Sequence, residues 1–272
     1  MLVYDRKLKT SVNEPEYKQE VLQFLYGSKI GRILLKTIFA RPWFSKLYGL
    51  YISSPLSKGK IRKFQTLYGI KDGKKYKSFN DFFTRNLTFE TASKENELIS
   101  PADAKLCVYR ISDDTKFYIK NSVYSIDELT SIKNTDFEYA LVFRLSVENC
   151  HRYIFFDDGR TILQKRIKGM LHTIREFEDG VYCKNSRFVT LMDTKHFGQA
   201  IQTEIGAMLI GKINNHGKRT FSRYEEKGYF EYGGSTVVLL INNIRPDEDI
   251  LKNSAAGIET RVHIGERIGE RI

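Results

Sequence analysis

Cysteine is scarce in this 272-residue chain, and its three cysteines lie far apart. Cys107, Cys150 and Cys183 are odd in number and form no Cys-x-x-Cys pair, which excludes a disulfide framework and a closely spaced zinc site. The chain also lacks a run of roughly eighteen uncharged apolar residues, and residues 1–7 do not resemble a signal peptide. We therefore expect a protein of the reducing, cytosolic side that does not cross a membrane.

The overall composition is that of an ordinary folded protein. Hydrophobic residues make up 41% of the chain and charged residues 28%, with only five prolines, so the chain can bury a sizeable core in one large or two small domains. The formal net charge of +11 predicts an anionic partner. Nucleic acid, a membrane surface and an acidic metabolite all satisfy this charge, and charge alone does not choose among them.

No acidic residue occurs between Glu20 and Asp72. Apolar periodicity over residues 14–69 predicts successive helices, and ten basic residues are interleaved there with Trp43, Tyr48 and several leucines. Basic helices with aromatic and aliphatic faces suit the surface of an anionic bilayer. Nucleic acid and a merely solvated basic face are the alternatives, but aromatic residues clustered with Leu and Ile suit acyl chains better than stacked bases.

From residue 98 onward the sequence changes to short β-type runs separated by turn signals. We therefore predict an α+β fold, in which a basic helical section, residues 1–76, precedes a β-rich sandwich or barrel-like catalytic domain, residues 77–272. At the junction, Ser78 is placed to cap a short helix with Asp81 in its first turn. Phe79, Phe82 and Phe83 share one face of that helix and are expected to pack as a latch.

A Gly-Gly-Ser-Thr tetrapeptide interrupts the strand-like residues 229–240. Paired glycines inside a strand pattern indicate a bulge or a close backbone approach. Ser235 directly follows Gly234, and a serine hydroxyl in a tight bend can attack the carbonyl that precedes it. The alternative interpretation is a hairpin corner with an incidental serine.

A serine nucleophile needs a base and a group that orients the base. His151, at the start of a predicted strand, and Asp103, in a Ser-Pro-Ala-Asp turn, are candidates. Each also has an ordinary interpretation, as a structural histidine and as a turn or capping residue.

Taken in order, several segments resemble the phosphatidylserine decarboxylase proenzyme family. The resemblance covers most of the chain and rests on residues 79–85 (FNDFFTR), 100–103 (SPAD), 151–153 (HRY), 168–173 (KGMLHT), 185–191 (NSRFVTL), 204–213 (EIGAMLIGKI) and 233–236 (GGST).

The resemblance implies a self-processing lyase of phospholipid synthesis. The chain would cut itself between Gly234 and Ser235 into a β subunit (1–234) and an α subunit (235–272), which stay together as a heterodimer. Ser235 would become a covalent pyruvoyl group, so neither a metal nor pyridoxal phosphate is expected. The amine of phosphatidylserine would form a Schiff base with this pyruvoyl group, which accepts electrons as carbon dioxide leaves and phosphatidylethanolamine is formed.

By position in the family motifs, Asp103, His151 and Ser235 would form a relay for self-cleavage, and His151 is the leading candidate for the later proton donor. The sequence departs from the family at three places. Ile154 stands where many members have a second histidine, which makes His172 a reserve proton donor. Residues 148–150 replace a common Asp-Tyr, and Ala104 replaces the usual glycine after Asp103.

The expected partners are phosphatidylserine and an anionic membrane surface, with no nucleic acid, and the expected location is peripheral, on the cytoplasmic face of the cell membrane. Two alternatives stay open. One is a pyruvoyl-dependent decarboxylase of a soluble amino acid, and the other is a catalytically inactive membrane-binding relative.

Overall fold

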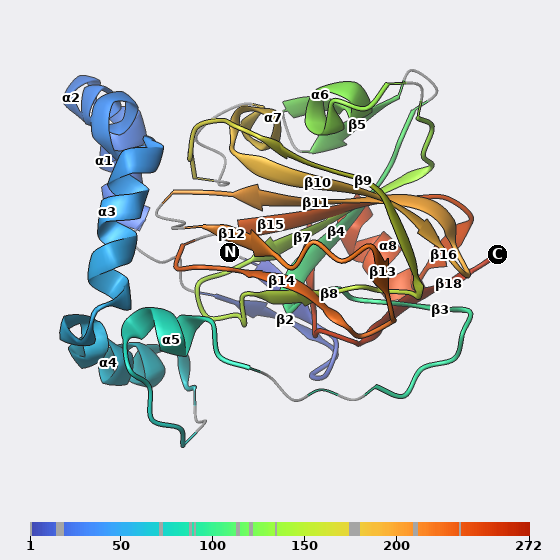
Figure 1. Ribbon diagram of the computed structural model, residues 1–272, viewed down its shortest axis with the longest axis horizontal. Coiled ribbons are helices and arrows are strands. Elements are labelled where there is room, and N and C mark those ends of the chain that lie inside the picture. Colours follow the sequence, from blue (N-terminus) through green and yellow to red (C-terminus); the bar gives the residue numbers. More distant parts are fainter. Residues whose placement is uncertain are drawn as a thin grey trace.

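The computed structural model describes residues 2–14, 19–70, 73–86, 89, 91–112, 115–119, 122–133, 135–173, 180–208, 212–233 and 235–272. Its fold is α+β, as the sequence predicts. Figure 1 shows a column of N-terminal helices standing against one side of a body built mainly of β-sheets.

The N-terminal column contains four α-helices and two short irregular helices. Ser28 caps the second helix by accepting a hydrogen bond from the Gly31 backbone N–H, and Gly69 ends the fourth in the left-handed conformation that favours glycine. The helices are α1 (Gln19–Gly27), α2 (Lys29–Leu34), the π-helix η1 (Leu35–Phe39), α3 (Pro42–Ser53), the 3-10 helix η2 (Pro55–Lys58) and α4 (Gly59–Tyr68).

Within the described residues, four further α-helices follow. They are α5 (Phe79–Phe83), α6 (Ile126–Thr130), α7 (Val181–Lys184) and α8 (Glu248–Ala255). The Ser78 side chain caps α5 by accepting a hydrogen bond from the Asp81 backbone N–H at 3.1 Å, so the predicted cap is confirmed.

The body is organised around a ten-stranded sheet with the order β13-β9-β10-β11-β15-β7-β4-β17-β1-β2. Its strands pair antiparallel except for β1 and β17, which run parallel. In chain order they are β1 (Leu2–Asp5), β2 (Thr10–Asn13), β4 (Ala104–Arg110), β7 (Tyr139–Leu145), β9 (Gly159–Ile167), β10 (Arg187–Thr194), β11 (Gly198–Gly206), β13 (Thr220–Phe221), β15 (Ser235–Ile241) and β17 (Glu259–Val262).

Three small sheets complete the body. They are β12 (Ile213–Asn215), β14 (Glu226–Phe230) and β8 (Arg152–Ile154); β16 (Ile244–Pro246), β18 (Arg267–Arg271) and β3 (Glu97–Ile99); and the hairpin β5 (Lys116–Ile119) with β6 (Ser122–Ser125).

The large sheet is covered on both faces, because β15 alternates its side chains between two hydrophobic cores. Val237 and Leu239 enter a core shared with residues of β8 and β14, whereas Val238 and Leu240 enter a core shared with residues of β5, α6 and α7. Figure 1 shows these two groups of elements on opposite sides of the sheet. Strand β15 is therefore buried on both faces, and all seven of its residues are buried.

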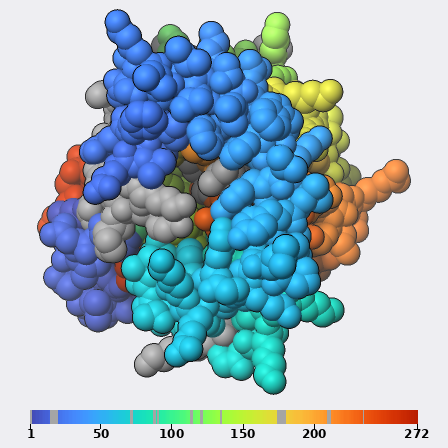
Figure 2. All heavy atoms as spheres, turned by 90° about the vertical axis from the view of Figure 1, so that its left-hand side faces the viewer, coloured from blue at the N-terminus to red at the C-terminus, as the bar shows by residue number. Residues whose placement is uncertain are grey.

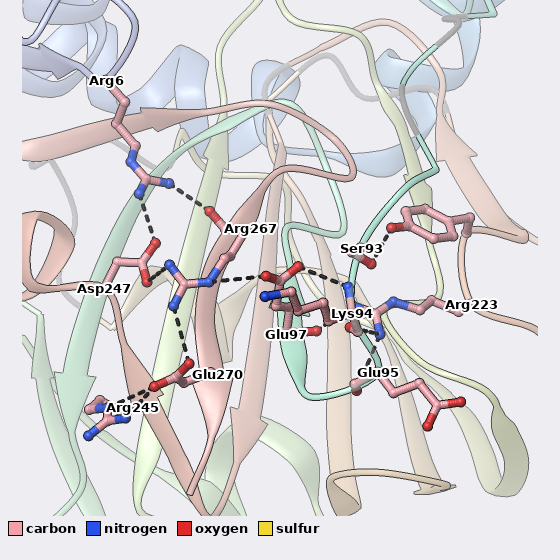
Figure 3. Close-up of polar contacts among 11 residues, drawn as sticks. Arg6, Ser93, Lys94, Glu95, Glu97, Arg223, Arg245, Asp247, Arg267 and Glu270 are labelled. Carbon is pink, nitrogen blue, oxygen red and sulfur yellow. Dashed lines mark hydrogen bonds and ion pairs between the residues drawn. The ribbon is translucent and has the colours of Figure 1, made fainter.

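An ion-pair network ties the chain ends and the long connection after α5 to the body (Figure 3). Arg6, in the turn between β1 and β2, pairs with Asp247 at 2.8 Å, and Asp247 also pairs with Arg267 at 2.7 Å. Arg223 donates a hydrogen bond to the Lys94 carbonyl at 3.0 Å, which fixes the connection just before β3 begins.

Two features of the large sheet refine the predicted fold. The large sheet ends at β13 on one side and β2 on the other, so within the described residues the β-body is layered and open and does not close into a barrel. Residues 2–13 pair in this sheet, although the sequence places them with the helical section. The helices predicted over residues 14–69 are present, and a division of the chain between residues 76 and 77 stays a prediction.

Candidate active site

Ser235 is the first residue of β15, in the middle of the large sheet. It lies opposite Gly206 of β11 on one side and Leu145 of β7 on the other. Its side chain is fully buried, and its Oγ has no hydrogen-bond partner among the described residues. An unsatisfied buried hydroxyl costs roughly 1–3 kcal/mol. The Ser235 hydroxyl therefore makes no hydrogen bond that stabilises the fold among the described residues.

The segment before Ser235 is bent and held from the helical side. Gly233 has φ 141°, a backbone region that residues with a side chain rarely adopt, so glycine is needed there. Gly234, the predicted cleavage residue, lies outside the described residues. Tyr232 packs against the rings of Phe79 and Phe83 of α5, and its backbone N–H donates to Asn80 Oδ1 at 3.2 Å. Thus α5 fixes the chain directly ahead of the serine.

His151 lies just before β8 and is fully buried. Its Nδ1 is 3.0 Å from the Asn149 carbonyl oxygen. Its Nε2 has no partner in hydrogen-bonding geometry among the described residues, although the backbone of Gly233 is close enough to raise the pKa of the ring. The stronger opposing effect is burial, which together with the charge of Arg85 lowers the pKa of His151 to about 3. The imidazole is therefore neutral at physiological pH and can accept a proton.

The predicted aromatic latch is confirmed as buried packing. Phe79, Phe82 and Phe83 are buried, and the Phe83 ring lies against His151 with ring centroids 3.9 Å apart. Because the same Phe83 ring contacts Tyr232, it touches both the histidine and the segment that precedes Ser235. The latch therefore joins the helical section to two of the predicted site residues.

Asp103 lies on a segment that is joined to β8 by the antiparallel bridge between Ala102 and Tyr153. Its Oδ1 accepts a hydrogen bond from the Ile264 backbone N–H at 2.8 Å and is 3.7 Å from His263 Nδ1. Within the described part of the chain, the structure records no hydrogen bond between Asp103 and His151. Sequence reasoning missed His263, because the Val-His-Ile-Gly segment carries no signal beyond that of a strand.

His172 lies on the other side of Ser235, next to β11. Its backbone N–H donates to Asn185 Oδ1 at 2.9 Å, and its carbonyl accepts from Asn185 Nδ2 at 2.8 Å. The same Asn185 Nδ2 donates to the carbonyl of Gly206, which pairs with Ser235, at 2.8 Å. One buried amide therefore links the His172 segment to the strand beside the serine.

A buried ion pair that the sequence did not reveal lies on the same sheet face as Ser235. Lys227 of β14 binds Glu204 of β11 with Nζ and Oε1 2.7 Å apart, and both side chains are almost fully buried. Glu204 is in register with Val237, two residues after Ser235. Burial lowers the pKa of Lys227, and the charge and hydrogen bond of Glu204 oppose this shift.

Two arginines near His151 have internal partners. Arg85 is buried and donates to the carbonyls of Phe82 at 3.3 Å and Glu148 at 3.0 Å. Arg152 pairs with Glu226 and donates to the Thr84 carbonyl at 2.8 Å. These contacts account for both side chains by local structure.

The buried thiol beside the candidate base is unsuited to act as a nucleophile. Cys150 Sγ donates to the Arg85 carbonyl at 3.2 Å, and burial raises the pKa of this thiol to about 11. No group of three or more His, Cys, Asp or Glu side chains suited to a metal ion occurs among the described residues. Ser235 therefore remains the candidate nucleophile.

Comparison with known proteins gives a consistent result. The sequence model of the phosphatidylserine decarboxylase family matches residues 79–270. The phosphatidylserine decarboxylase proenzyme 2 of Clostridium acetobutylicum is 44% identical, with 98% of each chain covered. The phosphatidylserine decarboxylase proenzyme of Clostridium botulinum is 35% identical over 98% of each chain, and that of Chlamydia pneumoniae is 34% identical over 97% of this chain and 95% of the relative.

Proposed function

Since the chain belongs to the phosphatidylserine decarboxylase family and is a carboxy-lyase, we propose that it is a proenzyme that cuts itself between Gly234 and Ser235 and then converts phosphatidylserine to phosphatidylethanolamine and carbon dioxide. The observations that carry the proposal concern two buried atoms, Ser235 Oγ and His151 Nε2, neither of which has a hydrogen-bond partner among the described residues. The backbone of Gly233 adjoins this histidine.

The first step of the proposed self-cleavage uses only groups of the chain. His151 Nε2 accepts the hydroxyl proton of Ser235, and Oγ bonds to the carbonyl carbon of Gly234. The peptide C–N bond then breaks, the nitrogen takes up a proton, and an ester joins Gly234 to the side chain of Ser235. A neutral imidazole is required for this step, and burial of His151 keeps it neutral.

The second step removes the ester. Loss of the Ser235 Cα proton breaks the bond between Cβ and the ester oxygen, so that Gly234 leaves as a carboxylate. Water then replaces the nitrogen of residue 235, which departs as ammonia. Both the hydroxyl and the amino nitrogen of the serine are consumed, and a pyruvoyl group remains at the start of the new chain.

The site fits this group. The hydroxyl it would come from is buried and has no partner among the described residues, and the residue facing it across the sheet is Gly206, which has no side chain. A pyruvoyl group supplies a carbonyl that accepts electrons during decarboxylation. The product carbon must then receive a proton. We assign this task to His151 first, with His172 in reserve, because Ile154 cannot supply it.

Asp103 keeps the third place in the proposed relay. It directly follows Ala102, which is bridged to Tyr153 of β8. Its carboxylate contacts Ile264 and His263. To orient His151 it would have to leave these partners. Replacement by Asn removes the charge at nearly constant shape, so a loss of self-cleavage in Asp103→Asn would support the assignment, and cleavage at the parental rate would remove Asp103 from it.

The cut chains are expected to remain together as a heterodimer. Strand β15, which would open the small subunit, pairs with β11 and β7 of the large subunit along its full length. Its residues are buried on both faces of the sheet.

We also propose that the helical column binds an anionic membrane surface, with the protein on the cytoplasmic face of the cell membrane. Its exposed apolar side chains include Ile30, Trp43, Leu47, Leu50 and Leu56. The basic residues interleaved with them are exposed as well. They are Lys29, Arg32, Lys36, Arg41, Lys46, Lys58, Lys60, Arg62 and Lys63.

Figure 2 shows this face, with orange-coloured atoms of the later strands visible between the helices. Each Lys or Arg near such a surface contributes about 1 kcal/mol. None of the described helices is long and apolar enough to span a bilayer.

The test is an intact mass spectrum of the denatured protein beside its Ser235→Ala variant. We expect two chains divided after Gly234, the smaller one lighter by one ammonia than a fragment starting with Ser, and a single chain for the variant. The processed protein is then given phosphatidylserine vesicles or free serine. Carbon dioxide from the vesicles alone supports the lipid substrate, release from serine alone indicates a soluble amino acid, and an uncut parental chain indicates an inactive membrane-binding relative.

A further inference from the structure

A tight turn joins the strand beside Ser235 to the candidate base. Strand β7 ends at Leu145, which is paired with Ser235, and the turn of residues 146–149 follows before His151. The Asn149 side chain builds this turn, because its Oδ1 accepts a hydrogen bond from the Ser146 backbone N–H at 2.8 Å. The Asn149 backbone N–H in turn donates to the Ser146 carbonyl at 3.0 Å. These two bonds fix the backbone of Asn149 relative to the end of β7.

The carbonyl of this fixed residue contacts the imidazole. The Asn149 oxygen lies 3.0 Å from His151 Nδ1. A carbonyl oxygen can only accept a hydrogen bond, so Nδ1 must carry the hydrogen. In a neutral imidazole this leaves the lone pair on Nε2, which has no partner in hydrogen-bonding geometry among the described residues. The turn therefore determines which nitrogen can accept a proton.

We propose that Asn149 is a positioning residue for self-cleavage, whose side chain orders the turn and whose carbonyl holds His151 in the tautomer with a basic Nε2. This inference rests on the proposed function and deepens it. In serine hydrolases a carboxylate performs this task. In this structure the Asn149 carbonyl contacts Nδ1, and the carboxylate of Asp103 is engaged by Ile264 and His263, so Asp103 could take over this task only after leaving these partners.

The substitution of a carbonyl for a carboxylate has a chemical consequence. A carbonyl fixes the tautomer but stabilises a protonated imidazole much less than a negative charge does. The positive charge of Arg85 also acts on the ring and opposes its protonation. His151 is thus suited to a transient role as base, passing the proton on at once to the leaving nitrogen.

The tautomer can be measured in the full-length Ser235→Ala chain, which cannot cut itself. Nitrogen-15 spectra of labelled histidine distinguish a protonated Nδ1 from a protonated Nε2. We expect the His151 signal, assigned by its loss in a Ser235→Ala/His151→Gln chain, to show the hydrogen on Nδ1 from pH 8 to pH 5. A hydrogen on Nε2 would overturn the proposal. This readout does not depend on whether the parental chain processes itself.

Self-cleavage of the otherwise parental chain tests the side chain of Asn149. Loss of the turn bond in Asn149→Ala should slow cleavage by about tenfold or more, since a well-placed base is worth 10²–10⁴-fold. Asn149→Asp retains an acceptor for Ser146 and should restore most of the rate.

Glu148→Gln is the matched control, because the Glu148 carboxylate contacts Lys105 and not the turn. It should cleave at the parental rate. Parental cleavage by Asn149→Ala, with an unchanged tautomer, would show that the side chain has no positioning role. If no chain cuts, including the parental one, the proposed function fails, and the tautomer spectra still decide the role of the carbonyl.

Discussion

The ring of Phe83 lies against the imidazole of His151, with the two ring centroids 3.9 Å apart and their planes inclined by 32°. This contact excludes water from one face of the histidine. It also connects the short helix α5 to the proposed base, so the helical section takes part in shaping the site and not only in covering it.

Replacing Phe83 should therefore slow self-cleavage. Phe83→Leu keeps an apolar side chain but removes the ring face that holds His151, and we expect cleavage at least several-fold slower with a loss of about 1–2 kcal/mol in unfolding free energy. Phe82→Leu is the control. Phe82 is equally buried, but its ring packs on Phe64, Tyr76 and Phe79. The rate of chain cutting is followed over time in both variants. If both cut equally slowly, the effect of Phe83→Leu would come from a general loss of packing and not from its contact with His151.

The depressed pKa of His151 predicts how stability depends on pH. The folded-state pKa of about 3 is below the unfolded value of about 6.5, so between these values the unfolded chain binds more protons. Stability contributed by the neutral histidine is complete above pH 6.5 and is lost as pH falls. We expect the unfolding free energy to drop by about 2 kcal/mol more between pH 7 and pH 5 in Ser235→Ala than in Ser235→Ala/His151→Gln. Urea unfolding measures both, and equal pH slopes would contradict the buried neutral state.

The same pKa predicts that self-cleavage does not titrate with an ordinary histidine. Since His151 stays neutral well below pH 6, the rate of chain cutting should be nearly constant between pH 8 and pH 5. A rate that falls with a midpoint near pH 6.5 would indicate an exposed base instead. Thermal unfolding at each pH confirms that the chain remains folded over the range.

Breaking the buried Lys227–Glu204 pair should destabilise the fold strongly. Glu204→Gln leaves the Lys227 charge buried without its counter-ion, which typically costs about 3–5 kcal/mol. Adding Lys227→Met removes that charge, so the double variant should regain much of the loss. Urea unfolding of the four chains gives the coupling energy directly. Additive effects would mean that the pair is not coupled.

If the helical column binds an anionic membrane, negative charge added to its exposed face should weaken that binding. Leu47→Glu/Leu50→Glu places two acidic groups on helix α3, at positions 60% and 72% exposed, and should weaken binding to phosphatidylserine vesicles without destabilising the fold. Ile272→Glu is the control, because Ile272 is 68% exposed but lies at the end of the body opposite the helical column (Figure 1). Vesicle sedimentation distinguishes them, and equal binding by all three proteins would remove the helices from the interface.

The sequence predicts those parts of the molecule that depend on local patterns. Apolar periodicity locates α1 to α4, alternation locates β4, β7 and β10, and the Ser78 cap is correct to the residue. Ser235 and His151 follow from motifs in a recognisable order. In the structure the Gly233 backbone, which precedes Ser235, lies beside His151. Phe83 of α5 contacts both His151 and Tyr232 of that segment.

The features that the sequence does not reveal depend on contacts between distant segments. One such feature is the start of α3 at Pro42, three residues after η1 ends, where the missing N–H of proline is not needed. The N-terminal strands are short, and their pairing with β17 brings together opposite ends of the chain. Likewise Lys227 resembles a surface lysine until the sheet register places it over Glu204, and Asn149 has no visible role until its carbonyl meets His151.

The order of strands in the large sheet has a consequence for the lifetime of the cut protein. In the sequence β11-β15-β7-β4-β17-β1, the strands β15 and β17 belong to the segment after Ser235, and each is flanked on both sides by strands from before it. The proposed subunits would thus be interleaved, and they could separate only by opening four ladders of the large sheet. A mixture of processed proteins with distinguishable small chains should exchange them only as fast as the whole molecule unfolds, so each α chain would stay for life with the β chain from which it was cut.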